Sequence, residues 1–438
     1  QLDSPQLYPK WTGTDVNLEV YDHSTHTWIA RPAGSALKLQ VHPRELTLHE
    51  EFSPSPVDLR RQEFCTAVTV HSRQGFSRQE GLFAKLDFAA TELVLLEKPL
   101  FLTDQKMDTV SGLEAAAKKF LALPQHQRQL VLSLYAPEQL PETFRDRVEI
   151  ALANLSQVER SDAKLFLKVL LTNGFNQKTF VVLYLLLSRA NHSCDPNAKY
   201  HQIPGVAIAV VALRPIPAGE EICISYVKER VLLTPLHERR SLLLKGSFGF
   251  SCWCTRCSCE YDSLRCFSCA RPGCLGVLCA GRQGLTGCLK CSLQLTPAAQ
   301  AELLQEETKL VTRYKQLRRH VDQGQMTSAD AVAYAEILQG MLQQTAAACI
   351  CPMHWIVERL HLLGYDIAQK SADHYAAYSH QAARLQFLDQ HLTRPSLHRG
   401  LERARLADAA SRLCFLPQAV EAALAAMEEL RCIIIVDR

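Results

Sequence analysis

Residues 191–197 read NHSCDPN, residues 219–226 read GEEICISY and residues 252–257 read CWCTRC. The first segment begins shortly after an apolar stretch at residues 180–187, so a buried element leads into groups that donate and accept hydrogen bonds. Such a transition is typical of a pocket that holds a ligand by backbone and side chains together. If residues 191–197 stood alone, a polar loop would be a sufficient interpretation. The presence of all three segments in this order favours a ligand pocket instead.

The second segment is predicted to lie on β-structure. Residues 206–212 are apolar throughout and predict a buried strand, and residues 215–219 predict a turn. Residues 222–226 are apolar at alternate positions, as expected of a second strand. Tyr226 therefore lies at a strand end, a usual place for a catalytic group. The two glutamates of this segment are expected to shape the turn by local hydrogen bonds.

Cysteine usage indicates the compartment. The sequence has 17 cysteines in 438 residues, with no recognisable signal peptide and no apolar run of bilayer length. We therefore expect an intracellular protein, cytoplasmic or nuclear, whose thiols bind metal and do not pair as disulfides. Because the first residue is Gln1, we expect a fragment or a processed chain.

One predicted zinc site uses the Cys-x-Cys-x-x-Cys spacing of Cys252, Cys254 and Cys257. These residues provide three thiolates, and a closed structural zinc site needs four ligands. Cys194 is the natural fourth candidate. An ion shared by these four residues would staple the C-terminal segment against the Asn191 segment, so metal binding would fold that segment and complete the pocket.

A second predicted zinc site has the spacing of a zinc ribbon. Its four predicted ligands form two Cys-x-x-Cys pairs, Cys266 with Cys269 and Cys288 with Cys291. Cys274 and Cys279 lie between the pairs, either as replacements for a ligand or as spectators, and Cys259 is unassigned. The remaining thiols are expected to be ordinary core cysteines: Cys65, Cys223, Cys349, Cys351, Cys414 and Cys432.

Together the three opening segments resemble the core of the SET-domain protein lysine methyltransferases. Residues 108–172 predict four amphipathic helices between two β-rich halves, and this arrangement resembles the SET and MYND domain family, in which the SET domain is split. That family carries a cysteine-rich MYND finger in the insert, whereas this sequence has no cysteine between Cys65 and Cys194. The resemblance therefore supports the catalytic core and not the MYND partner-binding function.

The C-terminal part of the sequence predicts six amphipathic helices with small residues at the helix contacts, similar to tetratricopeptide (TPR) pairs. In the resembling family such a domain closes over the substrate cleft; the alternative is a stabilising domain or a dimer surface. The predicted class is thus α+β, a split SET fold with six regions. These are a small β element (1–60), the first SET half (61–104), a helical insert (105–172), the second SET half (173–246), a post-SET zinc region with the ribbon (247–294) and a TPR-like helical domain (295–438).

The resemblance also implies roles for single residues. Asn191 and His192 would hold the adenosine part of S-adenosylmethionine, Tyr226 would place its hydroxyl beside the transferred methyl, and Phe250 would cover the adenine or the lysine channel. Tyr184 matches a second tyrosine of that channel, with a core aromatic as the alternative, and Asn173 matches a cofactor-contacting asparagine. The family's first cofactor loop is usually richer in glycine, and residues 77–82 keep only Gly81, so Arg78 would supply charge or be a solvated turn residue.

Methyl transfer to lysine sets a short list of chemical requirements. The site must hold a neutral amine in line with the methyl group and must offer oxygen atoms around that methyl. A lysine of ordinary pKa, about 10.4, is mostly protonated at neutral pH, so an apolar channel that favours the neutral amine is required. No general base is needed among the side chains.

Charge gives little indication of a partner. The 48 lysines and arginines nearly balance the 45 aspartates and glutamates, which leaves a net charge of +3 and no dense basic run for nucleic acid. The expected partner is a protein substrate carrying a lysine, histone or non-histone, with monomer and homodimer both open. The predicted function is therefore a protein-lysine N-methyltransferase that uses S-adenosylmethionine and structural zinc. The alternative is a catalytically silent SET-fold protein that binds a peptide or partner.

Overall fold

The computed structural model describes residues 67–72, 80–140, 142–176, 180–203, 207–245, 248–323 and 326–433, and the backbone of residues 16–22, 27–32 and 39–41. The chain divides into two compact units. One contains residues 51–227 and 237–256, and the other contains residues 1–50, 228–236 and 257–438. Among the described residues, no helix is long and apolar enough to cross a membrane.

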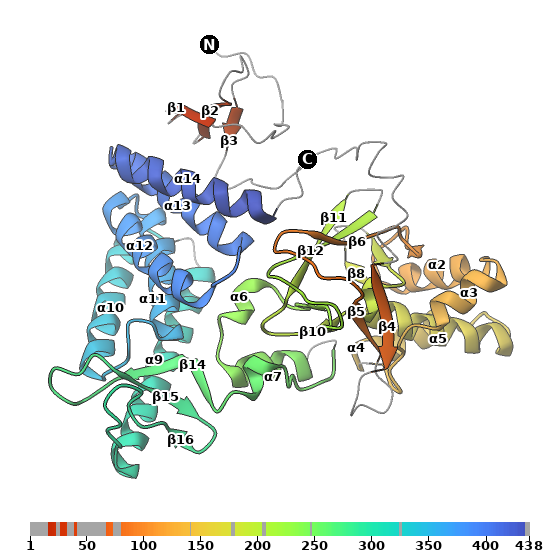
Figure 1. Ribbon diagram of the computed structural model, residues 1–438, viewed down its shortest axis with the longest axis horizontal. Coiled ribbons are helices and arrows are strands. Elements are labelled where there is room, and N and C mark those ends of the chain that lie inside the picture. Colours follow the sequence, from red (N-terminus) through yellow and green to blue (C-terminus); the bar gives the residue numbers. More distant parts are fainter. Residues whose placement is uncertain are drawn as a thin grey trace. The chain divides into compact units, whose positions relative to one another are not determined.

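The first unit contains several small sheets and, between β7 and β8, a group of helices (Figure 1). Strand β12 lies between β11 and β6 in one sheet, β9 lies between β7 and β8 in another, β4 pairs with β5, and β10 pairs with β13. The strands are β4 (Val68–Ser72), β5 (Glu80–Ala84), β6 (Leu93–Glu97), β7 (Phe101–Leu102), β8 (Phe175–Asn176), β9 (Val181–Leu183), β10 (Asn191–His192), β11 (Ala198–Ile203), β12 (Ala207–Ala212) and β13 (Cys223–Ile224).

The buried strand expected near residues 206–212 is present as β12. All six of its residues are buried, and β11 and β6 pair with its two edges. A continuous apolar run is expected of a strand that is covered on both faces. Its side chains join a hydrophobic cluster that also contains Leu82, Tyr184 and Ile224, and Tyr226 packs against this cluster. The core of the β-rich part therefore extends to the segments around residues 191 and 226.

Four helices form the insert between the β-rich halves, as predicted. They pack around a core in which the Phe120 and Phe166 rings stack with centroids 4.3 Å apart. A capping box begins the last helix, because Ser156 accepts a hydrogen bond from the backbone of Glu159 and Glu159 accepts one in return. The helices are α2 (Val110–Leu121), α3 (Gln125–Leu132), α4 (Glu142–Ala151) and α5 (Gln157–Asn173).

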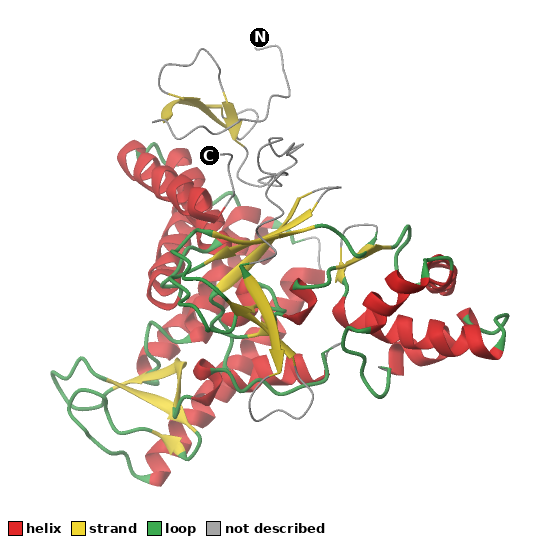
Figure 2. Ribbon diagram, turned by 45° about the vertical axis from the view of Figure 1, so that its right-hand side comes forward, coloured by secondary structure: helices red, strands yellow, loops and turns green. Residues whose placement is uncertain are grey.

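The second unit consists mainly of antiparallel helices, which Figure 2 shows packed side by side. The six long helices expected from the sequence are α9 (Pro297–Gln323), α10 (Ser328–Ala347), α11 (Trp355–Lys370), α12 (His374–His391), α13 (Leu397–Arg412) and α14 (Leu416–Ile433). A three-stranded ribbon precedes them, made of β14 (Tyr261–Ser268), β15 (Val277–Gly281) and β16 (Gly284–Leu285). The short helix α6 (Glu229–Leu232) also belongs to this unit.

The N-terminal element is a three-stranded antiparallel sheet, with strands β1 (Val16–Asp22), β2 (Thr27–Pro32) and β3 (Leu39–Val41) in that order. A small β element was expected in residues 1–60, and its strand β2 ends at Pro32. Proline fits this end because it has no backbone N–H to donate to a sheet.

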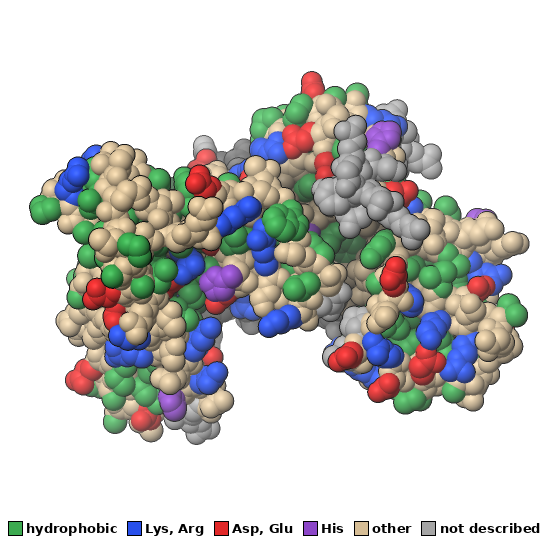
Figure 3. Space-filling model, turned by 90° about the horizontal axis from the view of Figure 1, so that it is seen from below, with side chains coloured by type: hydrophobic (Ala, Val, Ile, Leu, Met, Phe, Trp, Pro, Cys, Tyr) green, Lys and Arg blue, Asp and Glu red, His purple; other side chains and the backbone are tan. Residues whose placement is uncertain are grey.

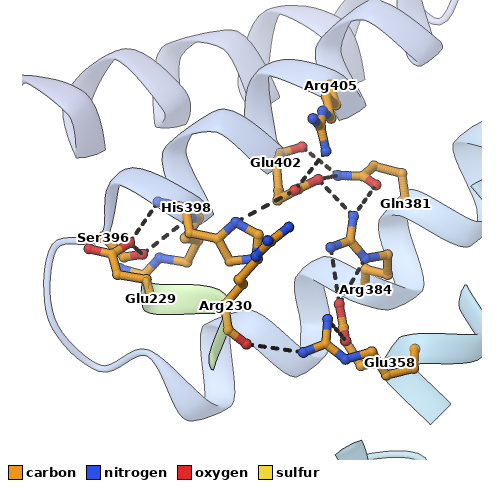
Figure 4. A network of polar contacts seen from close by, with 11 residues as sticks. Glu229, Arg230, Glu358, Gln381, Arg384, Ser396, His398, Glu402 and Arg405 are labelled. Atoms are coloured by element: carbon orange, nitrogen blue, oxygen red, sulfur yellow. Dashed lines mark hydrogen bonds and ion pairs between the residues drawn. The ribbon is translucent and has the colours of Figure 1, made fainter. Parts of the chain in front are cut away.

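A fully buried polar network ties the helices of the second unit together (Figure 4). The Arg384 guanidinium donates to Glu358 at 3.0 Å and to Glu402 at 2.7 Å, and all three residues are at most 2% exposed. Gln381 donates a further hydrogen bond to Glu402 at 2.8 Å. Because these residues come from α11, α12 and α13, the network fixes the packing of three helices, and every charge in it has an opposite partner.

The same view shows how α6 is attached to this unit. The Glu229 carboxylate accepts hydrogen bonds from the Ser396 hydroxyl and from the His398 backbone N–H, both at 2.8 Å. These donors lie at the start of α13, where a carboxylate satisfies unpaired N–H groups and interacts favourably with the helix dipole. The segment that follows Tyr226 in the chain is therefore anchored to the helical unit.

The Glu402→Gln variant should unfold more easily at neutral pH, by about 2 kcal/mol, because it removes the charge that pairs with buried Arg384. Burial raises the pKa of Glu402, but Arg384 and Arg405 outweigh it and hold that pKa at about 2. The stabilisation is therefore present above the ordinary glutamate pKa of 4.5 and is lost as pH falls toward 2. Urea unfolding at several pH values checks this. The difference between variant and wild type should shrink in acid, whereas exposed Glu421→Gln should show little difference at any pH.

Candidate active site and thiol clusters

The segments at residues 191–197 and 219–226 meet through a short parallel strand pair. Asn191 pairs with Cys223 and His192 pairs with Ile224, and the Ser193 N–H donates to the Ile224 carbonyl at 2.9 Å. This pairing brings two segments that are distant in sequence onto one edge. The two segments that the sequence analysis assigned to one pocket are therefore neighbours in the structure.

His192 holds Tyr226 in place. The Tyr226 backbone N–H donates to Nδ1 of His192 at 3.0 Å. Nδ1 is therefore the unprotonated nitrogen of this imidazole. Its other nitrogen, Nε2, lies 3.4 Å from the Cys194 sulfur. Burial lowers the pKa of His192 to about 4, which keeps the ring neutral. The imidazole thus links the tyrosine to the first group of thiols.

The Tyr226 hydroxyl has a defined direction. It donates to the Ala190 carbonyl at 2.9 Å, immediately before the Asn191 strand. Its ring lies with centroids 5.3 Å from Phe248, 5.4 Å from His192 and 6.2 Å from Phe250. Phe250 was expected near the cofactor, and Phe248 was missed. The residue between the two phenylalanines, Gly249, has a φ of 69°, a turn conformation that glycine adopts readily.

The side chain of Glu221 contacts both Asn191 and Gly81. The Asn191 amide donates to the Glu80 carbonyl at 2.9 Å and to the Glu221 carboxylate at 2.7 Å. A Cβ on Gly81 would lie only 2.8 Å from that carboxylate, so a larger residue here would displace the Glu221 side chain. Glu221 thus does the local hydrogen bonding that the sequence suggested. Arg78 lies outside the described residues.

Asn197 is a positioning residue that sequence reasoning missed. Its amide nitrogen donates to the Glu220 carboxylate and to the Glu221 carbonyl, both at 2.8 Å, and its oxygen accepts from the Cys223 N–H at 2.8 Å. The side chain is 3% exposed. It therefore joins the end of the first polar segment to the turn of the second. Its position as the last residue of the NHSCDPN segment could have indicated this role from the sequence.

Tyr184 lies in an apolar aromatic environment. It is 2% exposed, its ring packs edge-on against Phe175 with centroids 5.5 Å apart, and it shares one hydrophobic cluster with Tyr226. Burial raises the pKa of Tyr184 to about 12, with a smaller contribution from Glu97. Tyr200 packs edge-on against the same phenylalanine at 5.1 Å. Surroundings of this kind disfavour any charged group placed among them.

Asn173, predicted to contact the cofactor, is the last residue of α5. Its amide nitrogen donates to the Tyr135 carbonyl at 2.7 Å and to the Val169 carbonyl at 2.8 Å. Both bonds run to the helical insert and fix the end of the helix. A direct role at the cofactor stays a prediction.

The first predicted thiol set is assembled in the structure. The sulfurs of Cys194, Cys252, Cys254 and Cys257 all lie within 4.8 Å of one another, with 4.0 Å between the first two. Four thiolates around zinc, at about 2.3 Å from the ion, would lie about 3.8 Å apart, so the set fits a tetrahedral ion. The Cys194 N–H also donates to the Cys254 sulfur at 3.4 Å, and Arg256 donates to the Cys194 carbonyl at 3.0 Å. Such outer contacts orient metal ligands.

The second thiol set differs from the prediction in one member. The structure gathers Cys269, Cys274, Cys288 and Cys291, with sulfur pairs 3.6 Å and 3.8 Å apart. Cys274 takes the position that was predicted for Cys266. The physical reason is local geometry, because Cys266 lies inside strand β14 whereas Cys269 and Cys274 flank a turn after its end. Backbone N–H groups of Arg271 and Gly276 donate to the sulfurs of Cys269 and Cys274, both at 3.4 Å.

The exchange of one ligand can be tested by zinc analysis. Cys274→Ser should lower the zinc content by about one ion per chain, because a four-thiolate site loses a ligand. Cys266→Ser is the matched control and should keep the zinc content of the wild type. Elemental analysis after exhaustive dialysis gives the measurement. The opposite result, zinc loss with Cys266→Ser alone, would restore the spacing predicted from the sequence.

Comparison with known proteins identifies the β-rich part. Residues 79–227 match the family model described as SET domain. These residues are a SET domain. The match includes the helical insert as well as both β-rich halves, and it ends one residue after Tyr226.

Some proteins similar to this chain are named histone-lysine N-methyltransferases, and others are named for their SET or MYND domains. Histone-lysine N-methyltransferase set5 of Schizosaccharomyces pombe is 40% identical over 84 residues, 19% of this chain and 25% of that protein. A SET and MYND domain-containing protein of Dictyostelium discoideum is 43% identical over 75 residues, 17% of this chain and 21% of that protein. SmydA-8 isoform B, a SET domain-containing protein of Drosophila melanogaster, is 35% identical over 118 residues, 24% of this chain and 25% of that protein. The matched part thus spans a quarter or less of each relative.

Proposed function

We propose that this protein is a protein-lysine N-methyltransferase that uses S-adenosylmethionine. The observation that carries the proposal is the placement of Tyr226 within a SET domain: its backbone is held by His192 and its hydroxyl by the Ala190 carbonyl. Both holding groups belong to the segment around Asn191. Relatives named histone-lysine N-methyltransferase support the same reaction class.

The aromatic groups around Tyr226 fit the proposed cofactor. The ring centroids of Phe248, His192 and Phe250 lie 5.3–6.2 Å from that of Tyr226. We propose that these rings offer apolar faces to a purine and to a sulfonium cation. S-adenosylmethionine supplies a methyl group on a sulfonium that becomes neutral on transfer. Because the Tyr226 hydroxyl donates its proton to Ala190, its oxygen lone pairs remain as acceptors for polarised C–H groups. This residue is the proposed catalytic tyrosine.

Tyr184 and its neighbours are proposed to line the lysine channel. Burial disfavours the ionised forms of both Tyr184 and His192, as their shifted pKa values show. The same surroundings would favour the neutral form of a substrate amine, which is the nucleophile. No side chain has to accept the proton from lysine in this scheme, because the amine loses it to solvent before entering the apolar channel.

Two structural zinc ions are proposed, one in each thiol set. The first set joins Cys194, next to the SET motif, with the Cys252–Cys257 segment, and Phe250 lies two residues before that segment. Zinc bound by four thiolates would order this segment and with it the aromatic wall beside Tyr226. Metal binding and cofactor binding are therefore proposed to be coupled.

One observation favours the catalytically silent alternative. Glu221 fills the space beside Gly81 and accepts from the Asn191 amide, so two residues expected at the cofactor are engaged within the protein. Under this alternative the SET fold would bind a peptide or partner without methyl transfer. Binding of S-adenosylhomocysteine separates the two functions, because the alternative requires no cofactor pocket.

The proposed substrate is a lysine-bearing protein and not nucleic acid. Positive and negative side chains are intermixed on the face drawn in Figure 3, in keeping with the small net charge of +3. The free thiols among the described cysteines support an intracellular, nuclear or cytoplasmic setting.

Labelled methyl donor tests the reaction. The zinc-loaded protein is incubated with S-adenosylmethionine carrying a labelled methyl and with core histones, and in parallel with histones whose lysines have been blocked by acetylation. Label on the unblocked histones alone is expected. Equal label on the blocked histones would show that the acceptor is not lysine.

A further inference from the structure

A pair of cysteines in the ribbon belongs to neither thiol set. Cys266 on β14 and Cys279 on β15 are directly opposite each other in the antiparallel register, and their sulfurs lie 2.6 Å apart. Within the two thiol sets, three sulfur pairs are 3.6–4.0 Å apart and all pairs lie within 4.8 Å. Cys351 packs against this pair, and its backbone N–H donates to the Cys266 carbonyl at 3.2 Å. The close pair therefore has a different geometry from a tetrahedral metal site.

The strand register suits a covalent link. Residues directly opposite in an antiparallel pair have Cα atoms about 4.5–5.5 Å apart. A disulfide spans Cα distances of about 4.4–6.8 Å, so a bond between Cys266 and Cys279 would require no backbone movement. Both side chains also point to the same face of the ribbon, because directly opposite residues always do.

The pair also contains a ready nucleophile. The Cys266 thiol donates to the Ser263 carbonyl at 3.2 Å, and its sulfur lies 2.6 Å from the Cys279 sulfur. The hydrogen bond between the two sulfurs lowers the pKa of the Cys279 thiol, although burial opposes this, and raises the pKa of Cys266. The thiolate is the reactive form of cysteine, and the Cys266 proton is directed to the Ser263 carbonyl, so Cys279 is taken as the sulfur that reacts first.

We propose that Cys266 and Cys279 are a redox modification site, at which a hydroperoxide forms a cross-strand disulfide. The Cys279 thiolate attacks one peroxide oxygen, the O–O bond breaks, and the other oxygen leaves as water or an alcohol after taking a proton. Cys279 is then a sulfenic acid. Cys266 attacks its sulfur, the S–O bond breaks, and hydroxide leaves with the Cys266 proton as water. Two thiols lose two electrons, and the peroxide gains them.

The disulfide would close the base of the ribbon. Strand β14 ends at Ser268, directly before the ligand Cys269, and β15 begins at Val277, three residues after the ligand Cys274. A bond between the two strands therefore holds the loop that carries these ligands, with or without the ion. We expect the oxidised ribbon to resist proteolysis after zinc is removed, when the reduced ribbon is cut.

The burial of Cys266 and Cys279 restricts which reagents can reach them. Cys266 is 7% exposed and Cys279 is 1% exposed, whereas Cys414 is exposed. A small hydroperoxide should reach the pair, while a maleimide added to the native, reduced protein should label Cys414 and leave the pair unlabelled. Maleimide labelling of Cys266 and Cys279 at the rate of Cys414 would contradict the burial on which the selectivity depends.

Peptide mapping tests the proposal on the full, zinc-loaded chain. The protein is treated with hydrogen peroxide, blocked with an alkylating reagent, digested without reductant and analysed by mass spectrometry. A peptide linking Cys266 to Cys279 is expected, absent in Cys279→Ser and in samples treated with dithiothreitol, and present in Cys351→Ser. A link from Cys266 to Cys351, or free Cys266 and Cys279 after Cys414 has been oxidised, would overturn the proposal.

Zinc release, followed with a chromophoric chelator, gives a second readout. We expect the linked peptide to appear while zinc stays bound, since the ligand thiols are separate from the pair. Loss of zinc before the linked peptide appears would show that the ligands are the preferred target and would overturn the assignment. Neither measurement depends on methyl transfer, so the redox site and the proposed enzyme function stand or fall separately.

Discussion

Tyr226→Phe should lower the rate of methyl transfer by on the order of a hundredfold, while zinc content and the free energy of unfolding stay close to those of the wild type. The variant keeps the ring that packs against Phe248 and Phe250 but loses the hydroxyl that is held by the Ala190 carbonyl. The lost oxygen is the one proposed to lie beside the transferred methyl. Rates are measured with labelled methyl donor, and the number of methyl groups per lysine is read by mass spectrometry.

The matched control is Tyr135→Phe. Tyr135 is 59% exposed and contributes its backbone carbonyl, which the substitution keeps, to the bond with Asn173. It should transfer methyl groups at the wild-type rate. If Tyr226→Phe also shows an unchanged rate and unchanged products, Tyr226 has no part in the mechanism.

Cys252→Ser should remove about one zinc ion per chain and weaken S-adenosylhomocysteine binding at the same time. The first thiol set would fall to three thiolates, and a structural zinc site of this kind contributes on the order of 10 kcal/mol to the order of its segment. Phe250 lies two residues before Cys252, so loss of the ion should release the aromatic wall beside Tyr226. Elemental analysis and calorimetry on one preparation measure both effects.

Cys259→Ser serves as the control for that experiment. Cys259 is exposed, lies two residues after Cys257 and is outside the gathered thiol set. It should leave both zinc content and ligand affinity unchanged. A Cys252→Ser protein that loses zinc but binds the ligand with wild-type affinity would show that metal and pocket are not coupled.

The elements that bury continuous or periodic apolar residues were predictable from the sequence. Strand β12 has an unbroken apolar run, and the insert and C-terminal helices repeat apolar positions at helical spacing. A helix end can also be predicted from the sequence where a capping residue marks it, as Thr327 does at the start of α10. The TPR-like arrangement itself was a resemblance, and the helices alone do not test it.

The contacts of the site were less predictable because they join residues that are far apart in the chain. No local pattern indicates that Asn191 pairs with Cys223 or that Asn197 binds the turn at Glu220. Phe248 was missed because its direction depends on the turn at Gly249. The order of the motifs indicated which segments form the site. Which atoms are in contact depends on tertiary hydrogen bonds that the sequence does not reveal.

The second thiol set shows why spacing alone was insufficient. Cys266 and Cys269 have the spacing of a ligand pair, but strand β14 continues through Cys266 and directs it to Cys279 on the next strand. The turn that gathers ligands comes later and contains Cys274. A spacing rule counts residues, whereas a metal site depends on where the strand ends.

Calorimetric titration of the zinc-loaded protein with S-adenosylhomocysteine tests the central claim most directly, because it needs no knowledge of the substrate. The proposed pocket beside Asn191, His192 and Tyr226 predicts saturable binding of one ligand per chain. Loss of that binding in Cys252→Ser, with retention in Cys259→Ser, would connect the pocket to the first thiol set. Absence of binding to folded protein with full zinc content would contradict a cofactor-dependent enzyme and favour the silent SET fold.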